Sequence, residues 1–217
     1  MRGLLMTAEK KGWKPWANTI CYLPIDDNDT TSTVYDHSWN GNNFSCTNCS
    51  FQTSSGGKRV LHLFNWRLSK SGVMLPSPFF TINIWSSCAK LFSHIDKSGF
   101  TKNYWITISD NNVSFLTWSS VTSISWTPIR NSRYNICVTI NTNNNQKVYI
   151  NWVQVGSSSA NPDWTRMSTV TTYLWYDDWQ SQSSTWYIWA TILESGNRTE
   201  QQVLDYFNLT KRDYWIS

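Results

Sequence analysis

Few side chains in this sequence could carry out acid–base chemistry. Glutamate occurs only at positions 9, 194 and 200. Glycoside hydrolysis needs two carboxylates roughly 5 to 10 Å apart across a cleft, and no closely spaced pair of acidic residues lies on one face of a predicted strand. Asp177 and Asp178 are consecutive, so in a strand they would point to opposite faces. Glu200 has the position of a residue that stabilises a helix N-terminus. We therefore expect no enzyme, and the alternative of a glycoside hydrolase would depend on Glu194.

Calcium has one candidate site, the oxygen-rich segment 26–36, which contains Asp26, Asp27 and Asp29. The segment is not an EF-hand loop, because it lacks glycine at the sixth position and glutamate at the twelfth. Aspartate and asparagine also form ordinary turns. A calcium site and a plain turn therefore both stay open, and no other cofactor is expected.

The five cysteines are Cys21, Cys46, Cys49, Cys88 and Cys137. Cys46 and Cys49 form a single C-x-x-C pair that lacks the second half of a zinc site. An odd number argues against a full disulfide framework, although Cys46 and Cys49 could join in an oxidising compartment. Cys21 and Cys137 lie in strand patterns and are expected to be small apolar residues.

Polar loops are the remaining candidate sites, since asparagine, aspartate and aromatic side chains can meet the hydroxyls and ring faces of sugars. The candidate ligand-binding residues are Asp110, Asn111, Asn161, Asp163, Asp177 and Asp178. Each of these loops could equally be a solvated turn. Trp164 and Trp179 lie beside two of them and would provide stacking platforms.

Short β-strands are the elements that would position these loops. Runs of β-branched and aromatic residues between turn signals predict strands at 18–24, 58–64, 79–85, 103–109, 112–118, 134–140, 147–151 and 184–192. Ile136, Val138 and Ile140 share one face, which is the period of a half-buried strand. Only 198–208 has a helical pattern, with Thr199 as its N-cap. Many short strands with one late helix predict an antiparallel β-sandwich.

One hairpin has an unusual residue at its tip. In QKVYINWVQVGSSS (146–159), valines and isoleucines flank the pair Asn151-Trp152. A two-residue type I′ turn needs positive φ at both central positions, so Asn-Gly is the usual pair there. A bulky side chain in that conformation is a strained outlier.

The composition limits the class of protein. The 217 residues are 40% hydrophobic and only 15% charged, with a formal net charge of +4. Part of that charge lies in the N-terminal stretch, so we expect no nucleic-acid partner. No apolar run approaches the roughly 18 residues of a membrane span, and the first residues carry too short an apolar stretch for a signal peptide.

Five segments, in order, carry a family resemblance: 18–44 with the turn DHSWNGN, 57–66 (GKRVLHLFNW), 78–85 (PFFTINIW), 134–157 and 186–208. Together they resemble laminin G-like domains of the concanavalin A-like jelly-roll type. The resemblance runs from about residue 17 to 210. It implies a jelly-roll sandwich with ligand sites in rim loops, and in some members a rim calcium ion.

The chain departs from this family at glycine positions. Trp39, Trp66 and Trp152 stand where the family has glycine, whereas Trp85 matches a family tryptophan. The sequence holds 15 tryptophans and 9 glycines, while average usage of about 7% would give roughly 15 glycines. One hypothesis is a coding difference, because UGA specifies glycine in some uncultivated bacterial lineages and their phages. The alternative is a genuinely tryptophan-rich surface.

These patterns lead to one combined prediction. The fold is an all-β, two-sheet antiparallel jelly-roll sandwich with one short C-terminal helix packed at its edge. Residues 1–15 form a basic tail and 16–217 a single domain. The function is non-catalytic recognition, with a glycan or cell-surface polymer as partner, on a cell surface, pilus or phage particle. A purely structural domain of a surface or virion assembly is the alternative, and no membrane insertion is expected.

Overall fold

A computed structural model describes most of the chain. The described residues are 17–25, 32–53, 59–71, 80–86, 92–97, 101–108, 112–117, 121–126, 134–141, 143, 145–159, 170–174 and 186–214. For part of the strand residues, only the backbone is described. The basic tail predicted for residues 1–15 lies outside these ranges.

Within these ranges the chain forms fourteen strands and one helix. They are β1 (Thr19–Leu23), β2 (Thr33–Val34), β3 (Phe44–Thr53), β4 (Arg59–Ser71), β5 (Phe80–Ser86), β6 (Phe92–Lys97), β7 (Thr101–Ile108), β8 (Asn112–Thr117), β9 (Val121–Ser125), β10 (Tyr134–Ile140), β11 (Asn145–Ile150), β12 (Val153–Ser159), β13 (Val170–Leu174), β14 (Trp186–Ser195) and α1 (Glu200–Tyr214).

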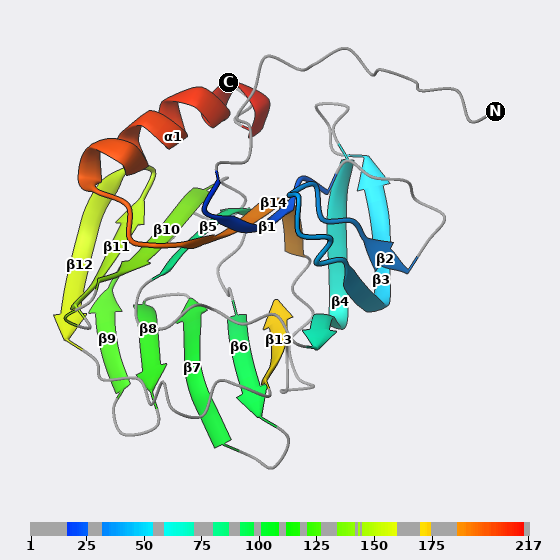
Figure 1. Ribbon diagram of the computed structural model, residues 1–217, viewed down its shortest axis with the longest axis horizontal. Helices are drawn as coiled ribbons and strands as arrows, with labels where there is room; N and C mark the ends of the chain where they lie inside the picture. The colour runs from blue at the N-terminus through cyan, green and yellow to red at the C-terminus, as the bar shows by residue number, and fades with distance from the viewer. Residues whose placement is uncertain are drawn as a thin grey trace.

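The strands form two antiparallel layers that share β4 (Figure 1). The first layer has the order β12-β11-β10-β5-β14, and the second has the order β13-β6-β7-β8-β9. The first half of β4 pairs with β14 through Leu61–Leu63, and its second half pairs with β13 through Leu68–Ser71. A long strand that passes from one sheet to the other makes a corner of a β-sandwich. The all-β sandwich predicted from the strand patterns is therefore confirmed.

Strand β10 is buried on both faces. Its side chains alternate as expected, but every residue from Tyr134 to Ile140 is buried. The prediction of a half-buried strand was wrong because α1 covers the second face. There Cys137 packs with Tyr149 of β11 and Val203 of α1 in one apolar cluster.

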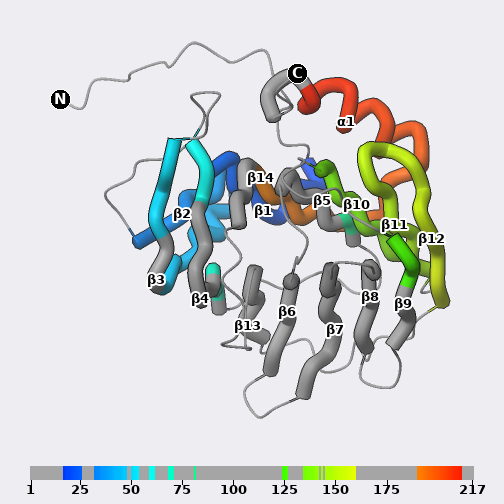
Figure 2. Tube along the Cα trace, turned by 180° about the vertical axis from the view of Figure 1, so that it is seen from behind, coloured from blue at the N-terminus to red at the C-terminus, as the bar shows by residue number. Residues whose placement is uncertain are grey.

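Helix α1 begins with a capping box. The backbone N–H of Gln202 donates to Thr199 Oγ1 (3.3 Å), and the N–H of Thr199 donates to Gln202 Oε1 (2.8 Å), which satisfies two donors at the helix start. Thr199 is therefore the N-cap, as predicted. The helix runs six residues further than expected, to Tyr214. It lies over the outer face of the first layer rather than at its edge (Figures 1 and 2), since Tyr206 packs on Ile192 of β14.

The two layers meet where their outermost strands, β12 and β9, come together (Figure 2). Gly156 of β12 faces Ile124 of β9, and a Cβ at position 156 would lie 2.5 Å from Ile124 Cδ1. Glycine in a strand often marks such a close approach. Gly156 thus lets the two layers close at this side.

Candidate functional site

The residues predicted to bind ligand or calcium lie in segments between described strands. Asp110, Asn111, Asn161, Asp163, Asp177 and Asp178 lie outside the described residues, and so do Asp26, Asp27 and Asp29. The strand ends that flank these loops are described, and their register places the points where several loops leave the sheet.

Two of the polar loops leave the same end of the second layer. Residues 109–111 follow β7, and residues 175–185 follow β13. Leu174, the last residue of β13, pairs with Ser93 of β6, and Ser93 pairs with Ile106 of β7. Neighbouring strands lie about 4.8 Å apart, so these two strand ends are about 10 Å apart. We call this end of the second layer the β7–β13 rim.

The other polar segments begin elsewhere. Residues 160–169, with Asn161 and Asp163, enter β13 at Val170, which pairs with Lys97 at the far end of β6. They reach β13 at the end opposite to the β7–β13 rim. The candidate calcium segment follows Ile25, which is fully buried and has φ of 56°. Positive φ in a β-branched residue is a genuine outlier, and no local pattern around Ile25 predicts it.

A turn between β2 and β3 is organised around Asp36. Its carboxylate accepts hydrogen bonds from the backbone N–H groups of Tyr22, Ser38 and Asn42 and from the Ser38 hydroxyl, at 2.7–2.8 Å. Asn40 donates from its side chain to the carbonyl of Thr19 at 2.7 Å. Since both oxygens of Asp36 are engaged in holding this turn on β1, its role is structural.

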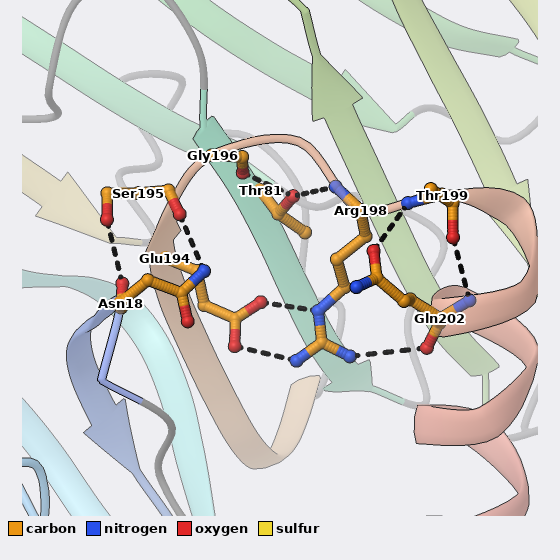
Figure 3. Close-up of polar contacts among 8 residues, drawn as sticks. All are labelled: Asn18, Thr81, Glu194, Ser195, Gly196, Arg198, Thr199 and Gln202. Atoms are coloured by element: carbon orange, nitrogen blue, oxygen red, sulfur yellow. Dashed lines mark hydrogen bonds and ion pairs between the residues drawn. The ribbon is translucent and has the colours of Figure 1, made fainter.

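The junction of β14 and α1 contains a buried ion pair (Figure 3). The Arg198 guanidinium donates through Nε and Nη2 to both oxygens of Glu194, whose side chain is fully buried. Thr81 on β5 joins the junction: its hydroxyl donates to the carbonyl of Gly196 (3.0 Å) and accepts from the N–H of Arg198 (3.1 Å). Burial would lower the pKa of Arg198, but the hydrogen bond and charge of Glu194 raise it above its ordinary value.

The ion pair makes the Glu194 carboxylate inaccessible to a substrate. A carboxylate that is buried and held at both oxygens by a guanidinium cannot reach a substrate, so Glu194 lacks the accessibility that a glycoside hydrolase would require of it. Sequence reasoning missed Arg198, although its i, i+4 spacing from Glu194 across the strand–helix junction was a signal.

Several groups beneath α1 titrate far from their ordinary values. Burial raises the pKa of the Cys137 thiol to about 12. It also raises the pKa of Tyr149 to about 12, with a smaller contribution from the charge of Glu200. Burial likewise raises the pKa of Tyr206 well above its ordinary value. These groups are neutral components of the interface between α1 and the sheet.

The three tryptophans that the sequence resemblance aligns with glycine differ in their surroundings. Trp152 has φ of 70° and Asn151 has φ of 49°, so the predicted turn with two positive φ angles is confirmed. The centroids of the Trp152 and Phe207 rings are 4.7 Å apart. Trp39 is 88% exposed and has no positive φ, and Trp66 lies inside β4, where only its backbone is described.

The cysteines are of two kinds. Cys46 is disulfide-bonded, whereas Cys21 and Cys137 are buried free thiols, as predicted. The side chain of the cysteine that forms the disulfide with Cys46 is not among the described side chains, so the predicted pairing with Cys49 stays a prediction. Among the described residues, no group of three or more histidine, cysteine or acidic side chains could hold a metal ion. Within the same ranges, no helix has the length and apolar character needed to cross a bilayer.

Comparison with known proteins gives similarity in structure alone. No protein-family model matches the chain, and no curated protein matches it in sequence. Domain 4 of AbnA, an extracellular GH43 arabinanase from Geobacillus stearothermophilus solved with arabinotriose, superimposes with a TM-score of 0.68 at 17% identity. That likeness covers 87% of this chain and 98% of the AbnA domain.

Botulinum neurotoxins provide further structural neighbours. A type C structure, from work on cell entry through two ganglioside molecules, has a TM-score of 0.64 and 16% identity, covering 88% of this chain. The type DC binding domain in complex with rat synaptotagmin II has a TM-score of 0.64 and 15% identity, covering 88%. The chain spans about half of these toxin chains, 51% in each. At these identities the likenesses establish the fold, a two-sheet jelly-roll sandwich.

Proposed function

We propose that this chain is a non-catalytic recognition domain that binds carbohydrate outside the cell. The observation that carries the proposal is the likeness to AbnA domain 4, which was solved with arabinotriose and which this fold covers almost completely. The type C neurotoxin neighbour, linked to gangliosides, points to the same class of ligand. Because a fold can host unrelated functions, the site must be tested on its own residues.

The proposed binding site is the β7–β13 rim. The loops that leave it carry Asp110 and Asn111 on one side and Asp177 and Asp178 on the other. Carboxylates accept hydrogen bonds from sugar hydroxyls, and the carboxamide both donates and accepts. Strand ends about 10 Å apart would let both loops contact one sugar unit. Asn161 and Asp163 would contribute only if their loop reaches this end, and a calcium ion, if bound, would use Asp26, Asp27 and Asp29.

Two features support binding without catalysis, outside the cell. The glutamates within the described residues are Glu194, which is buried in an ion pair, and Glu200, which lies at the exposed start of α1. Glu194 is therefore not available as one of the two carboxylates that hydrolysis needs across a cleft. The disulfide at Cys46 fits an oxidising compartment, where such bonds persist.

We further propose a laminin G-like kinship, on the five ordered segments described above. Trp39, Trp66 and Trp152 occupy glycine positions of that family, which would follow if UGA encodes glycine in the source organism. An aromatic contribution of Trp39 is therefore not part of the proposed site. The proposed domain comprises residues 16–217, preceded by the basic tail at 1–15.

A glycan array followed by titration calorimetry tests the proposal. We expect saturable binding to at least one glycan, weakened tenfold or more in Asp110→Asn/Asn111→Ala and in Asp177→Asn/Asp178→Asn. Asp205→Asn is the matched control, because Asp205 is an exposed residue of α1 that contacts Gln201. Chelation with EDTA tests the calcium site separately, and unchanged binding and melting would exclude it.

The alternatives give different outcomes. A folded chain that binds no glycan on the array would favour a purely structural role in a surface or virion assembly. Release of reducing ends from a polysaccharide would contradict the absence of catalysis.

A further inference from the structure

The tip of the β11–β12 hairpin has a backbone suited to glycine. Both central residues have positive φ, 49° at Asn151 and 70° at Trp152, which is the conformation of a type I′ turn. In this region an L-residue brings its Cβ close to the carbonyl oxygen, and only glycine adopts it freely. Asparagine tolerates the first position, so Trp152 is the residue that does not suit its backbone.

A second tryptophan lies in a strand irregularity. Thr47 of β3 pairs with Arg67 of β4, but Cys49 pairs with Leu63. The interval from Thr47 to Cys49 on β3 therefore lies opposite the longer interval from Leu63 to Arg67 on β4. Trp66 is among the extra residues of β4. The irregularity lies where β4 leaves β14 and joins β13. Glycine in a strand often marks such a bulge or corner.

A third tryptophan contributes little to the fold. Trp39 is 88% exposed, and within the described part of the chain no hydrogen bond or ring contact involves its side chain. Its backbone does not require glycine, but the turn held by Asp36 does not use its ring either.

We infer that the natural protein carries glycine at positions 39, 66 and 152, encoded by UGA. One coding difference explains a strained turn, a bulge, an unsupported exposed ring, and a sequence with 15 tryptophans but 9 glycines. The natural molecule then lacks these three rings. A ligand would be bound through polar loops rather than by stacking on them. Glycine at these positions does not depend on what the chain binds.

The source gene and the protein made by its own cells test the inference directly. We expect UGA at codons 39, 66 and 152, and glycine at those residues in peptides analysed by mass spectrometry. Trp85 is the matched control, because it lies in the central strand β5, paired with Asn135 and Ala190; its codon should be UGG. UGG at the three codons, or tryptophan in the natural peptides, would overturn the inference.

A thermal comparison tests the backbone requirement in the chain as printed. Trp152→Gly and Trp152→Ala both remove the ring from Phe207, so they differ only in the Cβ at a positive φ. Trp152→Gly should melt at the higher temperature of the two. Val153→Gly is the control, since Val153 is exposed and has no positive φ, and it should lower the melting temperature. A lower melting temperature for Trp152→Gly than for Trp152→Ala would show that position 152 does not call for glycine.

Discussion

Single side chains fix two parts of this molecule through hydrogen bonds that replace contacts with water. Asp36 holds the turn between β2 and β3 through its two carboxylate oxygens, and Glu194 holds the start of α1 through Arg198. Buried or partly buried charges of this kind are costly to leave unpaired. Their removal should therefore affect stability more than any surface change.

Replacing Asp36 should loosen the turn. Asp36→Ala leaves several backbone N–H groups without an acceptor, so we expect a loss of about 2–3 kcal/mol in the free energy of unfolding. Urea denaturation would measure it. Asp205→Ala on the exposed face of α1 is the control and should change stability by less than about 0.5 kcal/mol. An equally small effect for Asp36→Ala would show that the carboxylate does not organise the turn.

Glu194→Gln separates a structural role from a catalytic one. The substitution leaves the buried Arg198 charge without its counter-charge, which typically costs about 3–5 kcal/mol. Glu194→Leu/Arg198→Met should recover much of that loss, because a buried pair can be replaced by apolar residues. If Glu194→Gln instead left melting unchanged while abolishing turnover on a polysaccharide, Glu194 would be catalytic and its assigned role wrong.

At the scale of the elements, two interfaces complete the sandwich: that of α1 with the first layer, and that of β12 with β9. The helix buries the outer face of β10, which would otherwise be exposed, and β12 approaches β9 at Gly156. Both interfaces join segments far apart in the chain. Each can be perturbed by a small, local change.

Alkaline pH should weaken the interface beneath α1. The pKa of the Cys137 thiol rises from 9.0 to about 12 in the folded chain, and that of Tyr149 rises from 10.0 to about 12. The unfolded chain then loses these protons at lower pH than the folded one. The contribution of these two groups to the free energy of unfolding is therefore fully present below about pH 9 and is lost as pH rises towards 12. The loss is about 1.4 kcal/mol per pH unit for each group while it titrates. Melting curves between pH 7 and 11.5 should show the fall, and Cys137→Ala/Tyr149→Phe should make it shallower, with Tyr206 still contributing.

Closure of the layers should tolerate no added side chain at position 156. Gly156→Ala places its Cβ against the Ile124 side chain, and overpacking of this kind costs about 1–3 kcal/mol. Adding Ile124→Ala should relieve that cost, so a double-mutant cycle should give a favourable coupling between the two changes. Additive effects would indicate that β9 and β12 do not approach as closely as described.

At the scale of the whole molecule, local patterns predicted the fold, but the proposed site at the β7–β13 rim depends on long-range strand register. The alternation in 134–140 and the Asn151-Trp152 turn were sufficient to predict a strand and a hairpin. Strands such as Phe44–Thr53 were not predicted, because their polar residues obscure the alternation. The proximity of the β7 and β13 ends follows only from pairing through β6, which no local pattern encodes. The Glu194–Arg198 pair likewise depends on how α1 folds back over the sheet.

Titration of one array-positive glycan tests the central claim most directly, using the chain as printed and Trp39→Gly/Trp66→Gly/Trp152→Gly. Recognition by polar loops at the β7–β13 rim predicts saturable binding, with affinities for the two proteins that agree within about twofold, a difference of about 0.4 kcal/mol. It also predicts loss of binding in Asp177→Asn/Asp178→Asn. Binding that disappears in the triple glycine variant while its fold is retained, or that survives the rim substitutions, would contradict this account.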